Sequence, residues 1–171
     1  GFSGSGTSIG GMTANPANPK GNIFLAKLSS TGTAQWAKFI GIPTELDPVT
    51  MQAVQTYSRR PVVASDGTNV YFLSAYGGTI DLGGGFLDGL GTMPLAIGAF
   101  SGDGTHLWSK KLGDFTGGTY LTLAADSSGA VLAGDLKSMA NLTLGGGGAA
   151  LTVSPDGMFV GRMTAAKGDN V

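Results

Sequence analysis

The phrase GTAQWAKFIG, residues 32–41, returns in the same frame as GTHLWSKKLG at residues 104–113. Both copies read G-T-x-x-W-x-K-x-x-G, so a turn with glycine leads into an alternating segment that carries Trp36 or Trp108. Repetition of such a phrase is typical of proteins built from stacked structural units. The phrase therefore indicates a repeat architecture, and the sequence contains no third copy of it.

Other segments recur around this phrase in a constant order. An aspartate turn leads into an apolar run at residues 66–72 and 126–132, and further apolar runs occupy residues 23–28, 95–100 and 159–163. An aliphatic residue followed by two glycines recurs at residues 9–11, 82–84 and 144–146. The order of these segments predicts that each unit consists of a strand A, an aspartate turn, a strand B, a glycine-rich excursion, a strand C, a turn and a strand D.

The composition favours short strands over helices. The chain has 171 residues with 31 glycines, and Glu45 is its single glutamate. Good helix formers are scarce, while turn residues punctuate β-branched and aromatic runs such as NVYFLSAY, residues 69–76. We therefore predict an all-β protein.

Four antiparallel strands per unit are the blade of a β-propeller. The repeat predicts a partial blade at 1–41, a linker at 42–51, a complete blade at 52–114 and a blade without its last strand at 115–171. A closed propeller needs at least about four blades. We therefore expect a partial β-propeller whose partners are other blades of the same polypeptide or neighbouring chains. A β-sandwich is the alternative architecture.

The segments SDGTNVYFLSAYGGTIDLGGG, residues 65–85, and PLAIGAFSGDGTHLWSKKLGD, residues 94–114, resemble the secreted bacterial β-propeller repeats of the SBBP type. The resemblance extends over nearly the whole chain apart from residues 42–51, and it is weakest in the third copy. It implies a bacterial protein that is extracellular or attached to the cell surface.

Residues 26–36, AKLSSTGTAQW, also resemble the tryptophan docking motif of quinoprotein-type propellers, although Leu28 replaces the aspartate of that motif. This resemblance implies that Trp36 and Trp108 pack between adjacent blades and perform no chemistry. A sugar-stacking platform is the alternative role of these rings. With the aspartate missing, we expect neither quinone chemistry nor another cofactor.

Charge and residue counts exclude several classes of function. The formal net charge is −1 and basic residues do not cluster, which argues against a nucleic-acid partner. No apolar run is long enough for a membrane span. The chain lacks cysteine and has one histidine, His106, which excludes thiolate metal sites and relays of several imidazoles. We expect His106 to be solvated on an exposed strand edge.

Most aspartates have a structural interpretation. Asp66, Asp103 and Asp126 each stand in a turn before a strand, where a carboxylate accepts backbone N–H bonds. Asp81 and Asp88 flank LGGGFL, residues 82–87, and could bind calcium through their oxygens. They could also form the carboxylate pair of a glycosidase. The D-x-D-x-D-G spacing of a calcium loop is absent, so neither interpretation is preferred.

The excursions between strands B and C are the expected binding loops, because blades hold such loops in place. The first contains Asn18 and Lys20, and the second combines Phe86 with Asp88. We predict a non-catalytic structural or interaction module that binds a protein or polysaccharide through these loops. The alternatives are a segment of a carbohydrate-active propeller enzyme, or a surface scaffold that assembles itself by strand addition.

Overall fold

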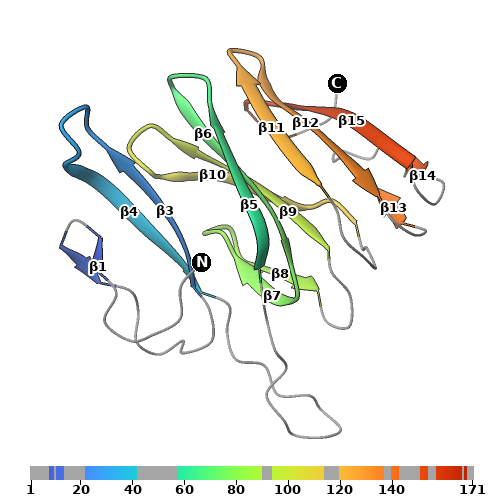
Figure 1. Cartoon of the computed structure of the whole chain (residues 1–171), viewed down its shortest axis with the longest axis horizontal. Helices are drawn as coiled ribbons and strands as arrows, with labels where there is room; N and C mark the ends of the chain where they lie inside the picture. The colour runs from blue at the N-terminus through green and yellow to red at the C-terminus, as the bar shows by residue number, and fades with distance from the viewer. Residues whose placement is uncertain are drawn as a thin grey trace, which may run out of the picture.

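The computed structural model describes residues 8–9, 11–13, 22–41, 58–89, 94–113, 120–136, 140–142, 151–153, 157–166 and 168 (Figure 1). Every regular element in these ranges is a strand, which confirms the predicted all-β class. The described ranges contain no helix that could span a membrane.

The strands form three sheets and three small hairpins, and no sheet among them closes on itself. The first sheet pairs β3 (Asn22–Leu28) with β4 (Ala34–Gly41). The central sheet contains, in spatial order, β10 (His106–Lys111), β9 (Leu95–Ser101), β6 (Asn69–Tyr76) and β5 (Ser58–Ser65). The third sheet contains β11 (Leu121–Asp126), β12 (Gly129–Leu136) and β15 (Gly157–Thr164).

The central sheet is an antiparallel meander that is buried on both faces. Asn69 pairs with Ser101 and Val70 with Ser65, which fixes the register on both sides of β6. Because side chains alternate along a strand, Tyr71 and Leu73 point to one face and Phe72 to the other. All three are buried, so β6 contributes to two separate cores.

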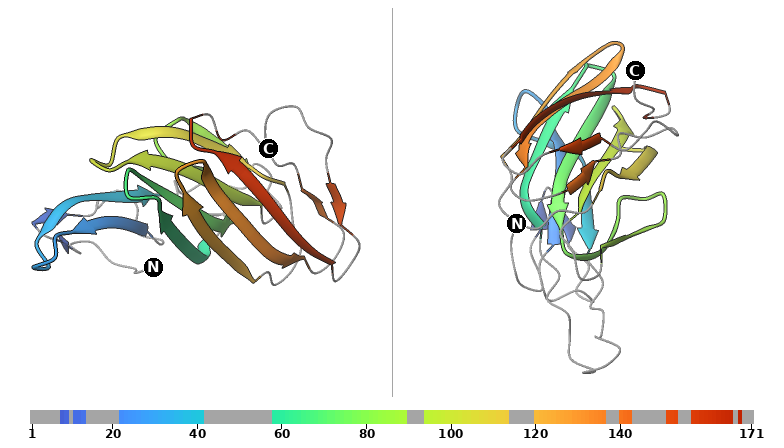
Figure 2. Two further views of the ribbon diagram at one scale, coloured as in Figure 1. Left: turned by 90° about the horizontal axis from the view of Figure 1, so that it is seen from above. Right: turned by 90° about the vertical axis from the view of Figure 1, so that its right-hand side faces the viewer.

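Each face of the central sheet packs against a different neighbour. One core joins it to the first sheet through Ile23, Leu25, Ile40, Phe72, Ala96 and Phe100. The other joins it to the third sheet through Tyr71, Leu73, Ile97, Ala99, Leu132, Phe159 and Met163. The three sheets therefore follow one another through the molecule (Figure 2).

The second and third sheets lie closest along their first strands. Backbone contacts between these two sheets are concentrated on β5 and β11, each an edge strand of its own sheet. The remaining strands of the two sheets make fewer backbone contacts, although their side chains share one core. The two sheets therefore meet as a wedge.

Three two-stranded hairpins lie outside the three sheets: one precedes β3 and two are inserted between sheet strands. They are β1 (Ser8–Ile9) with β2 (Met12–Thr13), β7 (Gly78–Asp81) with β8 (Phe86–Gly89), and β13 (Ala140–Leu142) with β14 (Leu151–Val153). Ile80 of the second hairpin and Leu142 of the third are buried. Leu142 also pairs with Gly113, two residues after the end of β10. The second and third hairpins are thus part of the packed structure.

The strands occur in the predicted order. Strands A to D of the middle unit are β5, β6, β9 and β10, and the third unit provides β11, β12 and β15. Residues 22–41 form two strands joined by a turn. The predicted linker, 42–51, lies outside the described residues. The division into blades and the closure of a propeller stay predictions.

Candidate functional site

The two tryptophans link successive sheets through backbone carbonyls. Trp36 Nε1 on β4 donates a hydrogen bond of 3.0 Å to the carbonyl of Gly102, in the turn between β9 and β10. Lys27 Nζ donates to the same oxygen at 2.8 Å. Trp108 Nε1 on β10 donates at 2.9 Å to the carbonyl of Ala165, directly after β15. Each indole therefore reaches the turn that follows the corresponding strand of the next sheet.

A glycine lies beneath each indole. A Cβ added to Gly104 would stand 2.9 Å from the Trp36 ring, and one added to Gly168 would stand 2.5 Å from the Trp108 ring. Both glycines have positive φ, 86° and 63°. These positions require glycine for both reasons, because a side chain would strain the backbone and collide with the ring. We call each such glycine and its turn a tryptophan seat.

Asp66 and Asp126 cap turns, as their position before a strand suggested. Asp66 Oδ1 accepts the N–H groups of Thr68 at 2.7 Å and Asn69 at 2.6 Å, and its Oδ2 accepts the hydroxyl of Tyr71 at 3.0 Å. Burial alone would raise the pKa of Asp66, but these hydrogen bonds lower it on balance. Burial and the bond to Asp66 raise the pKa of Tyr71.

Asp126 is more exposed and is held by two partners. It accepts bonds from the N–H and the hydroxyl of Ser128, and it forms an ion pair with Arg162 of β15. The Ser128 bonds and the Arg162 guanidinium lower the pKa of Asp126 from 3.8 to about 2. Asp126 therefore joins the turn before β12 to β15.

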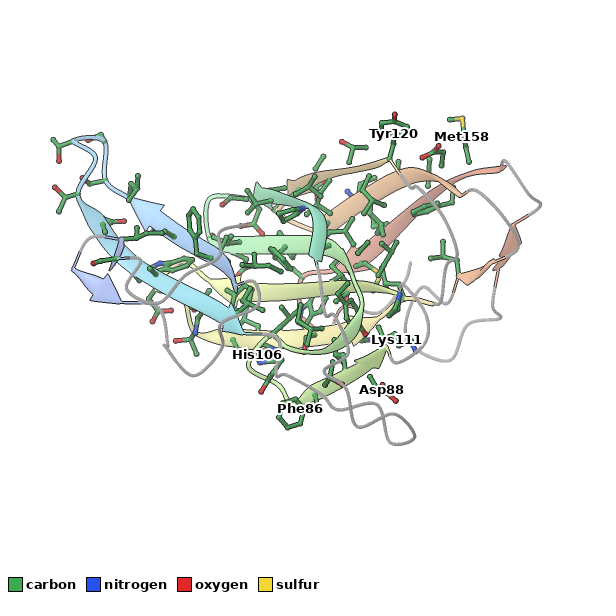
Figure 3. The ribbon with its side chains drawn as sticks, turned by 60° about the horizontal axis from the view of Figure 1, so that its bottom comes forward. Phe86, Asp88, His106, Lys111, Tyr120 and Met158 are labelled. Atoms are coloured by element: carbon green, nitrogen blue, oxygen red, sulfur yellow. The ribbon has the colours of Figure 1, made fainter. Side chains whose placement is uncertain are left out.

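The β7–β8 hairpin carries the predicted binding residues of the second excursion. Thr79 pairs with Asp88 and Asp81 pairs with Phe86, so these four side chains share one face of the hairpin. Ile80 and Leu87 point the other way, into the core with the first sheet. Phe86 is 71 % exposed at the edge of the molecule, near Asp88 (Figure 3). A flat apolar ring and two carboxyl groups therefore lie on one outward surface, which we call the hairpin face.

Asp81 has a structural task within this hairpin. Its Oδ1 accepts the N–H of Gly83 at 2.7 Å and that of Gly85 at 3.2 Å, which holds the tip of the loop. Among the described residues, no three side chains of the types His, Cys, Asp or Glu gather closely enough to hold a metal ion. Calcium at Asp81 and Asp88 stays a prediction.

His106 does not have the solvated environment that we expected. Its imidazole packs edge-on against Phe100, with centroids 5.9 Å apart, and its Nε2 is buried without a hydrogen-bond partner. Burial lowers the pKa of His106; the Asp81 carboxylate acts in the raising direction and the Lys38 ammonium in the lowering one. A Cβ added to Gly84 would stand 2.5 Å from Cε1, so the glycine loop covers the ring closely.

A β-bulge explains this difference. His106 pairs with Phe100 and Trp108 pairs with Ala99, so the register shifts between them. Simple alternation would place His106 and Trp108 on one face, whereas the bulge turns them to opposite faces of the sheet. The glycines of residues 83–85 were the sequence signal for a close approach, but the sequence did not show what approached them.

The remaining predicted site residues, Asn18 and Lys20, lie outside the described residues. Comparison of the chain with models of known protein families, with curated proteins and with solved structures found no match. The geometry above is therefore the basis for any functional assignment.

Proposed function

We propose that this chain is part of a β-propeller that serves as a non-catalytic interaction module, secreted by or attached to the surface of a bacterium. Its hairpins bind a polysaccharide or a protein surface, and its stacked sheets hold them in place. The location rests on the resemblance to SBBP-type repeats. The observation that carries the binding role is the hairpin face, with Phe86 exposed beside Asp81 and Asp88.

Three features support a propeller over a two-layer sandwich. The central sheet packs against a different sheet on each face, whereas a sandwich has two layers. The second and third sheets meet along their first strands and form a wedge, as blades do around an axis. The same tryptophan contact joins the first sheet to the central one and the central one to the third.

The hairpin face suits a sugar ligand chemically. An exposed aromatic ring can stack on the C–H surface of a sugar ring. Carboxylate oxygens beside it can accept hydrogen bonds from sugar hydroxyls. The hairpin is anchored by Ile80, which is buried, so the ring is presented from an ordered element.

A glycan array with the full chain tests the proposal, with a panel of surface proteins as its second arm. Phe86→Ala should abolish binding while leaving the unfolding midpoint unchanged. Tyr120→Ala is the matched control, since Tyr120 is 67 % exposed and lies on the opposite side of the molecule (Figure 3). Equal binding by wild type and Phe86→Ala would contradict the assignment. Turnover of glycosides that is lost in Asp88→Asn would replace it with an enzymatic one.

A further inference from the structure

The strands β3, β9 and β15 occupy equivalent positions in the three sheets. Each ends at a turn whose glycine N–H donates back to the last strand residue or the one directly after it: Gly32 to Ser29, Gly104 to Ser101 and Gly168 to Thr164. Counting back from these three acceptors aligns the strands residue by residue. Equivalent positions can then be compared between a sheet in the middle of the stack and sheets at its ends.

One face of these strands is buried in the first two sheets and exposed in the third. Leu95 and Ile97 of β9 are fully buried against the third sheet. Their equivalents on β15 are Met158 and Val160, which are 83 % and 68 % exposed. The outer face of the third sheet is therefore an apolar surface of the kind that the central sheet covers with a neighbour. We call it the tail face.

The opposite face is buried in the central and third sheets and exposed in the first. Phe100 of β9 and Met163 of β15 each pack against the preceding sheet and are buried. Their equivalent on β3 is Leu28, which is 53 % exposed. Phe24 and Ala26 share its face, because side chains alternate along the strand. We call this outer surface of the first sheet the head face.

The charges near the tail face are engaged within the chain. Asp126 forms an ion pair with Arg162, and Asp135 accepts the N–H of Tyr120. On β3, Lys27 reaches across to Gly102 on the inner side of the first sheet. Leu28, Met158 and Val160 give both outer faces apolar centres. Asp135, which lies across from Met158, keeps its hydrogen bond from the Tyr120 N–H when a neighbour packs there.

We infer that copies of this chain associate head to tail, with the tail face of one copy packing on the head face of the next. This contact continues the stacking that already joins the three sheets inside the chain. A second copy carries both halves of that contact at equivalent positions. A head-to-tail contact is heterologous, so it closes into a ring or extends as a filament according to the rotation between copies.

The contact between copies differs from the internal ones in one respect. Gly32 has φ of 82° and the same turn as Gly104, but an added Cβ would have no neighbour within 4 Å among the described residues. Gly32 and its turn thus have the form of a third tryptophan seat, but no indole of the described chain lies over it. The chain has only Trp36 and Trp108, and both occupy internal seats. Association between copies is therefore weaker than the internal packing and depends on protein concentration.

Light scattering of the full chain over a range of concentrations tests this inference. Wild type should grow beyond the monomer mass. The tail variant Met158→Lys/Val160→Lys and the head variant Leu28→Lys should each be monomeric. Mixed in equal amounts they should form a dimer and nothing larger, because one intact head meets one intact tail. Val63→Lys, at a valine 56 % exposed on β5, is the control that should retain the wild-type mass.

Cross-linking gives an independent readout that keeps both faces nearly apolar. The chain has no cysteine, so single cysteines report one contact each. Mixed Leu28→Cys and Val160→Cys variants should form a disulfide-linked heterodimer on oxidation, in preference to either homodimer. A wild type that stays monomeric at all concentrations would overturn the inference. A Val160→Cys homodimer as the main product would replace it with a tail-to-tail contact.

Discussion

Trp36 lies over Gly104 across the boundary between the first and central sheets, so closely that a methyl group on the glycine would stand 2.9 Å from the ring. The same relationship joins Trp108 to Gly168 at the next boundary. At the first boundary the tryptophan of one copy of the repeated phrase thus meets the glycine of the other copy, and at the second boundary Trp108 meets a glycine outside the phrase. The tryptophan of one unit meets the glycine of the following unit.

Gly104→Ala should destabilise the protein more than Gly32→Ala. Both substitutions place a side chain at positive φ, which costs about 1 to 2 kcal/mol. Only the first adds a collision with an indole, for which overpacking costs about 1 to 3 kcal/mol more. Urea denaturation measures both variants on the same scale. Equal losses of unfolding free energy would mean that the ring does not press on Gly104.

Trp108→Phe should cost more stability than Trp36→Phe. Each substitution removes one indole N–H from a partly buried carbonyl, and leaving such an acceptor without a partner costs up to about 1 to 3 kcal/mol. The carbonyl of Gly102 keeps Lys27 as a second donor when Trp36 is replaced. No second side-chain donor to Ala165 was found among the described residues. Denaturant midpoints check this order. The double substitution Trp36→Phe/Lys27→Met removes both donors to Gly102, so its loss of stability should be closer to that of Trp108→Phe.

The protein should lose stability between about pH 4 and pH 2. The pKa of Asp126 falls from 3.8 to about 2 on folding, so the unfolded chain binds this proton more readily. The stabilisation is therefore complete above pH 3.8 and is lost as the pH falls toward 2. Asp126→Asn should flatten this part of the curve of unfolding free energy against pH, and Ser128→Ala should flatten it partly. An unchanged slope in Asp126→Asn would contradict the assignment.

His106 should titrate below its ordinary pKa of 6.5 in the folded protein. It is the only histidine, so one Cε1–H signal in a proton NMR titration reports it directly. Because the folded pKa is lowered, the stabilisation from the neutral ring is present above pH 6.5 and is lost as the pH falls below that value. A midpoint at or above 6.5 would show that the imidazole is solvated.

Gly84→Ala should be destabilising because its Cβ would stand 2.5 Å from the His106 ring and 2.9 Å from the Ser109 hydroxyl. Overpacking of this kind costs about 1 to 3 kcal/mol. In the background of His106→Ala the same substitution should cost much less, since the ring is gone. A double-mutant cycle measures the difference. If the two substitutions have additive effects on the free energy of unfolding, the glycine loop moves away from the imidazole without resistance.

The sequence predicted the strands well because their signals are local. Aspartate turns and alternating runs such as residues 69–76 specify strands without reference to the rest of the chain. The all-β class and the order of strands in residues 58–111 follow from such signals. The capping role of Asp66 is equally local, because its acceptors bind N–H groups two and three residues away.

The environment of His106 and the seats of the tryptophans depend on tertiary structure. The bulge in β10 changes the face on which His106 lies, and nothing in the residues HLW specifies it. The partner of Trp36 is more than sixty residues away, in a turn that looks like an ordinary hairpin connection. The repeat showed that both tryptophans share a role, but the glycines beneath them became visible only in three dimensions.

The burial of the central sheet on both faces has a consequence for how the molecule opens. In a linear stack each sheet is stabilised by its nearest neighbours, and among the three described sheets only the central one has a neighbour on each side. Opening should begin at the outer sheets and reach β6 and β9 last. Amide hydrogens in these two strands should be the slowest to exchange with deuterium, and exchange should quicken toward β3 and β15. The stacking of repeated units would thus be measurable as a gradient of amide protection, highest in the central sheet and lower toward both outer sheets.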